Sequence, residues 1–260
     1  MTGEQDYFLE KYGHYAVKGW KDADDNGFKE PIFHQEIVDE LDSWYHHVVA
    51  VNQAHAAALG ANPSIKLTTM KPSGSVSKLP GLSAGIHFHY APYIIQRIRF
   101  NELDENLKIL EMCGFPIERA QREPNTMIVE FPVKAPNADH PNFQSADNTT
   151  LEEQFANQYL FAYAWADNAV SATLTFKYEE QSQIEPLLSW YGQRVKTISL
   201  LPYSGHGYVQ APWEPIDKAE YERRVAEIKM WPEQIYETLN TLENIELSEA
   251  DCLGGACPIK

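Results

Sequence analysis

Extended apolar segments alternate with helical segments along most of this 260-residue chain, and this alternation limits the folds that it can form. The clearest extended segment is 170–176, where apolar and polar side chains alternate strictly, as they do in a half-buried strand. The same reasoning predicts strands at 65–70, 93–100, 126–133 and 197–201, and helices at 31–60, 104–112, 151–167 and 183–193. Residues 218–242 are predicted to form one or two helices that are interrupted at Pro232. Strands that alternate with helices favour an α/β architecture.

The charge and the hydrophobic pattern of the chain argue against some kinds of binding partner. The chain carries 37 acidic and 21 basic residues, a formal net charge of -16, and the acidic residues are spread along its length. Such a surface repels phosphate backbones, which argues against nucleic acid as a partner. No stretch approaches 18 uninterrupted apolar residues and no signal-like start is present, so we expect no membrane partner and a cytoplasmic location.

Two of the three cysteines lie in the last nine residues. Cys252 and Cys257 are separated by four residues that include Gly254 and Gly255, so a disulfide between them is sterically accessible. A dithiol on a flexible tail can exchange with a disulfide elsewhere and be reduced again by a thioredoxin-type partner. Two alternatives stay open: unreactive surface cysteines, or half of a zinc site. Cys113 lies among apolar residues of a predicted helix and is expected in the core.

A short loop after the predicted strand 65–70 has the composition of an anion-binding turn. It runs Lys71-Pro72-Ser73-Gly74-Ser75-Val76-Ser77, in which small residues let backbone N–H groups converge and serine hydroxyls add donors. The spacing is not that of a Walker A loop. An ordinary turn is the alternative interpretation.

Two short motifs, one with histidines and one with aspartates, resemble metal-binding sequences but are incomplete. If His87 and His89 lie on a strand, both rings share a face, but no third ligand is evident and a structural role is favoured. Residues 22–27 open like a calcium loop, yet Phe33 occupies the position that requires glutamate. We therefore assign no metal ligand.

Taken together, these motifs resemble the adenosylcobalamin-dependent (class II) ribonucleoside-triphosphate reductases of the monomeric type. The resemblance is strongest from about Lys66 onward and would place the chain at the C-terminal portion of those enzymes. It is carried by 69–77, 85–88, 93–100, 170–176, 199–203 and the ending 251–260.

The resemblance implies a fold, a reaction and a set of site residues. The fold would be the C-terminal part of a ten-stranded α/β barrel, with residues 1–30 as an N-terminal polar, loop-like segment, 31–243 as the half-barrel and 244–260 as a flexible redox-active tail. Ribonucleoside triphosphate would be the substrate, thioredoxin the reductant and adenosylcobalamin the cofactor. The loop that holds the substrate phosphates would be Pro72, Ser73, Gly74, Ser75, Val76 and Ser77, and Cys252 with Cys257 would be the tail dithiol.

The chain departs from the family pattern at the radical site. No Asn-Pro-Cys-x-Glu-like motif is present, so the cysteine that would carry the thiyl radical is missing. We therefore expect a partner chain that supplies the N-terminal half-barrel and the radical cysteine, without which this chain is inactive. The alternatives are a catalytically inactive nucleotide-binding or regulatory module, and a remnant of a split reductase.

Overall fold

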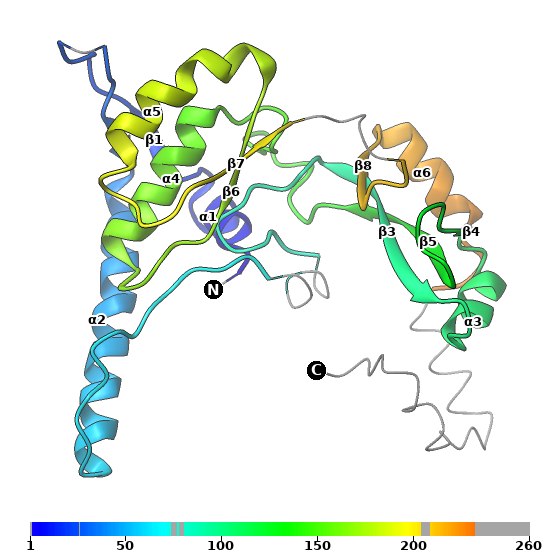
Figure 1. The fold of residues 1–260 in the computed structure, drawn as a ribbon, viewed down its shortest axis with the longest axis horizontal. Helices are drawn as coiled ribbons and strands as arrows, with labels where there is room; N and C mark the ends of the chain where they lie inside the picture. The colour runs from blue at the N-terminus through cyan, green and yellow to red at the C-terminus, as the bar shows by residue number, and fades with distance from the viewer. Residues whose placement is uncertain (1, 26, 74–76, 78–80, 204–208, 232–260) are drawn as a thin grey trace. The chain divides into compact units, whose positions relative to one another are not determined.

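The structure, a computed structural model, describes residues 2–25, 27–73, 77, 81–203 and 209–231. It divides into two compact units, Met1–Gln96 with Pro132–Tyr221, and Arg97–Phe131 with Glu222–Lys260. Figure 1 shows the elements of each. Over the described residues, none of the helices is both long enough and apolar enough to cross a bilayer.

Helix α4 (Leu151–Ala164) is the centre of the larger unit. Its side chains Phe155, Leu160 and Phe161 are fully buried. The helix begins where the sequence predicted: Thr150 accepts a hydrogen bond from the backbone N–H of Glu153, whose carboxylate accepts one in return from the backbone of Thr150. This capping box satisfies donors that the first turn would otherwise leave unpaired.

A pair of parallel strands follows α4 in the chain, and the first of them lies against that helix (Figure 1). Strand β6 (Thr173–Phe176) pairs with β7 (Ser199–Pro202), and the crossover between them contains η1 (Tyr178–Gln183) and helix α5 (Ile184–Tyr191). A parallel pair joined through a helix is a βαβ unit, which is consistent with the α/β architecture that the alternating sequence pattern predicted.

The first thirty residues are not loop-like, which corrects the prediction. They contain helix α1 (Glu4–Tyr12) and strand β1 (Val17–Trp20), which pairs antiparallel with β2 (Pro31–Phe33). Phe8 and Leu9 of α1 are buried, and so are the polar residues of its first turn. The long helix predicted from residue 31 begins later, as α2 (Gln35–Ala58).

Strand β3 (Tyr93–Asn101) confirms the extended segment predicted there, and it pairs antiparallel with β8 (Trp213–Pro215). Strand β5 (Thr126–Lys134) lies between β3 and β4 (Ile117–Arg119), which gives the order β4-β5-β3-β8. Helix α6 (Lys218–Glu227) follows β8 and ends earlier than predicted, because residues 228–231 are not helical. The rest of the predicted helical stretch, 232–242, lies outside the described residues.

The smaller unit has a core of its own. Helix α3 (Asn106–Cys113) ends at Gly114, whose φ of 88° glycine adopts without strain. Cys113 is 2% exposed among Leu107, Leu110, Phe115 and Val129, which confirms that it is a core residue.

One predicted strand is wrong. In the described chain, residues 65–70 run as a loop, with a single parallel bridge between Met70 and Val170, and Ile65 is 90% exposed. The half-barrel and tail boundaries at 31–243 and 244–260 stay predictions, and the tail lies outside the described residues.

Candidate functional site

A cavity of about 800 Å³ opens in the larger unit. Its wall is built by the segment 81–91, by β6 and β7, by the first residues of β3 and by Trp213 of β8. The volume is typical of a site for a small molecule. The cavity is therefore lined both by strands and by the irregular segment 81–91.

Two residues of the predicted phosphate loop reach this cavity. Pro72 and Ser73 line it, while Ser77 is fully buried beside Ser73. The Ser77 N–H donates to Ser73 Oγ at 2.8 Å, and the Ser77 hydroxyl donates to the Ser73 carbonyl at 3.1 Å. Gly74, Ser75 and Val76 lie outside the described residues. The ends of the loop are thus closed on each other at the edge of the cavity.

Gly85 allows the segment 81–91 to lie against the start of that loop. Its φ is +57°, and a Cβ at this position would meet the carbonyl oxygen of Lys71 at 3.0 Å. Two buried amides hold the next residue: Gln5 of α1 and Asn157 of α4 both donate to the carbonyl of Ile86, at 3.1 and 3.0 Å. This wall of the cavity is therefore fixed from two helices.

His87 is a structural histidine, as predicted. Its Nδ1 lies 2.6 Å from the carbonyl oxygen of Ala84, so this nitrogen must donate, and its Nε2 accepts from the Thr173 N–H at 2.9 Å. Both ring nitrogens are occupied, which fixes the neutral tautomer and ties the loop to β6. The His-x-His segment itself lies in a loop rather than on a strand.

His89 faces a different partner. Its Nε2 lies 2.6 Å from Asp6 Oδ1 of α1, and Asp6 Oδ2 accepts from the Ser83 N–H at 2.8 Å. Burial alone would raise the pKa of Asp6, but the hydrogen bond and charge of His89, together with the bonds from Ser83, outweigh it and lower that pKa. Asp6 is therefore an ionised carboxylate that orients a cavity-lining imidazole.

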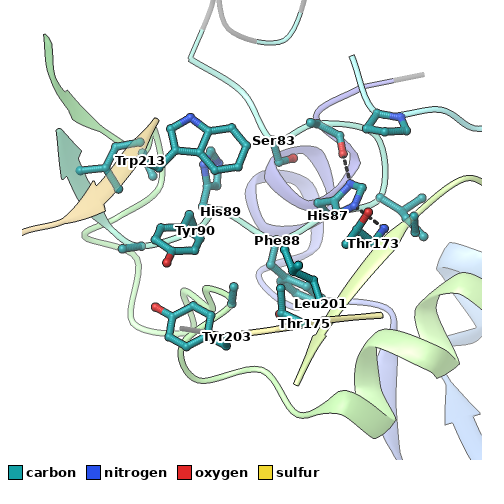
Figure 2. Close-up of a pocket in the computed structure, with 18 of the residues that line it drawn as sticks. Ser83, His87, Phe88, His89, Tyr90, Thr173, Thr175, Leu201, Tyr203 and Trp213 are labelled. Atoms are coloured by element: carbon teal, nitrogen blue, oxygen red, sulfur yellow. Dashed lines mark hydrogen bonds between the residues drawn. The ribbon is translucent and has the colours of Figure 1, made fainter. Parts of the chain in front are cut away.

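Aromatic side chains form one side of the cavity. Figure 2 shows Tyr90, Tyr203 and Trp213 together there, opposite His87 and Thr173. The ring centroids of Tyr90 lie 5.3 Å from Tyr203 and 6.1 Å from Trp213. Burial raises the pKa of Tyr203 to about 12, so its phenol keeps its proton at neutral pH. This wall offers flat apolar faces together with hydroxyl donors.

Sequence reasoning found the loop but not the aromatic wall, the Asp6–His89 pair or the amides that hold Ile86. These residues come from five separate segments, and no local spacing connects them. The tail cysteines Cys252 and Cys257 lie outside the described residues. The part of the site that can be described is thus a ligand cavity rather than a redox centre.

The fold is part of the fold of a class II ribonucleotide reductase. It superposes with a TM-score of 0.86 on the crystal structure of a B12-dependent (class II) ribonucleotide reductase at 44% sequence identity, over 95% of this chain and 35% of that one. No protein-family model matches the chain.

Curated relatives agree with this class. The chain is 47% identical over its whole length to the adenosylcobalamin-dependent ribonucleoside-triphosphate reductase of Lactobacillus helveticus, and 46% identical to that of Lactobacillus leichmannii. It spans 36% of the length of each. The resemblance seen from Lys66 onward therefore extends over the whole chain, which is homologous to about one third of these reductases.

Proposed function

We propose that this chain is the C-terminal component of a ribonucleoside-triphosphate reductase and converts ribonucleoside to 2′-deoxyribonucleoside triphosphates together with an N-terminal partner chain. The observation that carries the proposal is the cavity bounded by Pro72 and Ser73, in a chain 44–47% identical to class II reductases. In the proposal this chain supplies the substrate-phosphate loop and the tail dithiol. The partner supplies the radical cysteine.

The cavity suits a nucleotide in size and in chemistry. The aromatic wall offers stacking surface, and Ser73 lies at the position where the loop begins. Among the described residues that line the cavity there is no lysine or arginine, so triphosphate would be held by N–H and hydroxyl donors. That is the mode of binding for which the loop Pro72–Ser77 was singled out, each such donor contributing on the order of 1 kcal/mol.

Adenosylcobalamin does not fit this cavity. A corrin ring with its nucleotide arm and adenosyl group is far larger than a nucleoside triphosphate, and the cavity of about 800 Å³ is within the ordinary small-molecule range. The residues that line this cavity are therefore not assigned to the cofactor. In the assembled enzyme the cofactor supplies the radical chemistry.

The tail dithiol closes the redox cycle. Reduction of one ribonucleotide produces water, one deoxyribonucleotide and one active-site disulfide. A Cys252 or Cys257 thiolate attacks that disulfide, the second tail thiol resolves the mixed disulfide, and two electrons and two protons leave the tail. Thioredoxin reduces the tail disulfide by the same exchange, which requires the reducing environment of the cytoplasm.

The test is reconstitution. The purified chain is mixed with the N-terminal chain, adenosylcobalamin, a ribonucleoside triphosphate and a thioredoxin system, and deoxynucleotide is measured. The matched control carries Cys252→Ser and Cys257→Ser, and we expect it to stop after about one turnover because the active-site disulfide is not reduced again. Absence of product with a partner that demonstrably binds would favour the alternative, an inactive nucleotide-binding module.

A further inference from the structure

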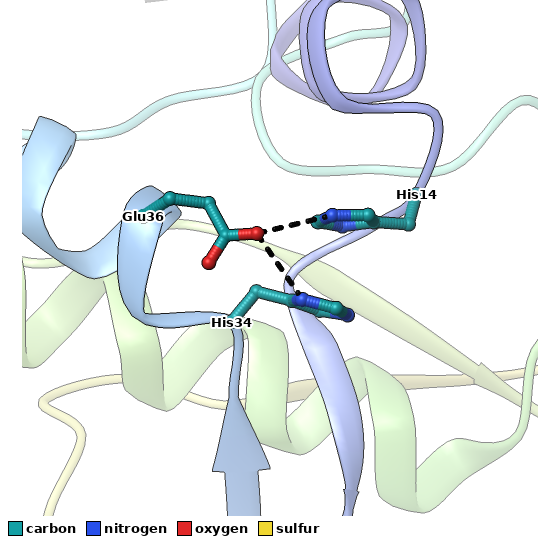
Figure 3. Close-up of side chains that lie close together, drawn as sticks. All are labelled: His14, His34 and Glu36. Carbon is teal, nitrogen blue, oxygen red and sulfur yellow. Dashed lines mark ion pairs between the residues drawn. The ribbon is translucent and has the colours of Figure 1, made fainter.

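Three side chains that do not line the cavity meet at the start of α2. His14 follows α1, His34 is the residue before α2, and Glu36 lies in the first turn of that helix. Figure 3 shows the two imidazole rings one over the other, with the carboxylate of Glu36 facing both. Their ring centroids are 3.5 Å apart and the rings are inclined by 17°. None of the three has a role in the proposed reaction.

The distances from the Glu36 carboxylate to the two imidazoles are those between neighbouring ligands of one metal ion. Glu36 Oε1 lies 3.3 Å from His14 Nε2 and 3.4 Å from His34 Nδ1, and all three atoms lie within 4.8 Å of one another. Tetrahedral zinc, with bonds of about 2.0–2.2 Å to nitrogen and oxygen, holds neighbouring ligand atoms roughly 3.3–3.5 Å apart.

The tautomer of His14 favours a bound cation beside Glu36. Its Nδ1 lies 3.1 Å from the carbonyl oxygen of Tyr15, and since a carbonyl can only accept, Nδ1 carries the hydrogen. In the neutral ring the lone pair on Nε2 then faces the Glu36 carboxylate, so two acceptors meet unless a proton or a cation lies between them. Histidines that bind metals ordinarily donate their other ring N–H to a carbonyl in this way.

We propose that His14, His34 and Glu36 form a binding site for a divalent cation of the zinc class, with a fourth position open to solvent. Two imidazoles, one carboxylate and a water are a known zinc ligand set. The rings must open from their stacked position to direct both lone pairs at one ion, and the exposed fractions of 29% and 20% leave room for this. The Glu36 side chain is 49% exposed, which gives the ion access.

The bound ion would join the segment that follows α1 to the first turn of α2. Both lie in the larger unit, and α1 also carries Gln5 and Asp6, which hold the wall of the cavity. The site is therefore expected to add stability to the part of the fold that positions that wall, since an ion that binds only the folded state stabilises it.

The test uses the full chain in the Cys252→Ser/Cys257→Ser background, because the tail thiols can themselves bind zinc. Zn²⁺ affinity is measured by competition with a chromophoric chelator, and Co²⁺ reports tetrahedral geometry by its visible absorption. We expect one Zn²⁺ per chain at micromolar concentration, and a loss of affinity of about 100-fold in His14→Gln and in His34→Gln. The matched control is His46→Gln, an exposed histidine 3.3 Å from Asp42, which should bind as the parent does.

Three results would overturn the site: no zinc binding by the parent, equal affinity in His14→Gln and the parent, or an equal loss in His46→Gln. If circular dichroism shows that a histidine variant is unfolded, the zinc affinity of Glu36→Gln tests the site instead. Glu36 is exposed, so the fold should tolerate this change. Removal of the charge should weaken Zn²⁺ at least tenfold and leave the unfolding curve in chelator unchanged. Unchanged affinity in Glu36→Gln also rejects the site, because Glu36 would then not be a ligand.

Discussion

His89 Nε2 and Asp6 Oδ1 lie 2.6 Å apart, although 83 residues separate them in the sequence. Asp6 is 5% exposed and also accepts the Ser83 N–H, so one carboxylate of α1 holds both a cavity-lining ring and the backbone beside it. The pair shows how the segment 81–91, which has little regular structure, is fixed in position.

Replacement of Asp6 by Asn should destabilise the chain by about 1–3 kcal/mol, because a buried charged hydrogen bond is replaced by a weaker one. The pKa of Asp6 is lowered in the folded chain, so its contribution is present above the ordinary value of 3.8 and is lost as pH falls below it. Urea unfolding of the parent and of Asp6→Asn should therefore differ at pH 7 and converge toward pH 3. The exposed Asp42→Asn is the control, and an equal effect there would contradict the assignment.

The buried carboxyl group of Glu4 should make the free energy of unfolding depend on pH in the opposite direction. Burial raises its pKa to about 7 from 4.5, so the folded chain favours the protonated acid. Stability should be unaffected by this group below pH 4.5, fall as pH rises, and level off above about pH 7. The free energy of unfolding of Glu4→Gln minus that of the parent should thus grow by on the order of 3 kcal/mol across this range. Glu10→Gln, exposed on the same helix, should show no such trend, and a flat difference for Glu4→Gln would reject the prediction.

Part of this fold follows from local sequence pattern, and part depends on contacts that no local pattern encodes. Helix α4 and strand β3 were predicted because apolar residues recur along them at the right period, and in the structure Thr150 and Glu153 cap the start of α4. Helix α1 was missed because its first turn buries Glu4 and Asp6, residue types that normally lie at the surface.

The predicted strand at 65–70 failed for a related reason. Its β-branched residues favour extended backbone, but a strand also needs a partner along its length, and here only Met70 forms a bridge. In the site, Ser73 could be singled out because small residues cluster around it in the sequence. Tyr90, Tyr203 and Trp213 could not, because the fold alone brings them together.

Ser73 should matter for phosphate and not for the nucleoside. Its Oγ accepts the Ser77 N–H at 2.8 Å, and Ser73 is one of the residues that line the cavity. Ser73→Ala opens the loop and removes a donor, so we expect roughly 5- to 10-fold weaker binding of a ribonucleoside triphosphate, or about 1 kcal/mol. Calorimetry on the assembled two-chain enzyme should show unchanged affinity for the free nucleoside. Ser64→Ala, at an exposed position, is the control, and equal losses for nucleoside and triphosphate would place the phosphates elsewhere.

Substitution of Trp213 should affect binding of the nucleobase, at the opposite end of the nucleotide from the phosphates. It lies beside Tyr90 on the aromatic wall and is 39% exposed, so a base can stack on it. Stacking of a base on an aromatic side chain contributes about 1–3 kcal/mol, and Trp213→Ala should therefore weaken triphosphate and nucleoside alike by roughly 5- to 150-fold, while Trp213→Phe retains most of the affinity. Trp231→Ala, with a comparable exposed fraction of 43% in the smaller unit, should bind as the parent does. Loss of triphosphate binding alone would show that Trp213 orders the loop at 72–77 and does not contact the base, because a stacking residue cannot distinguish ligands that share that base.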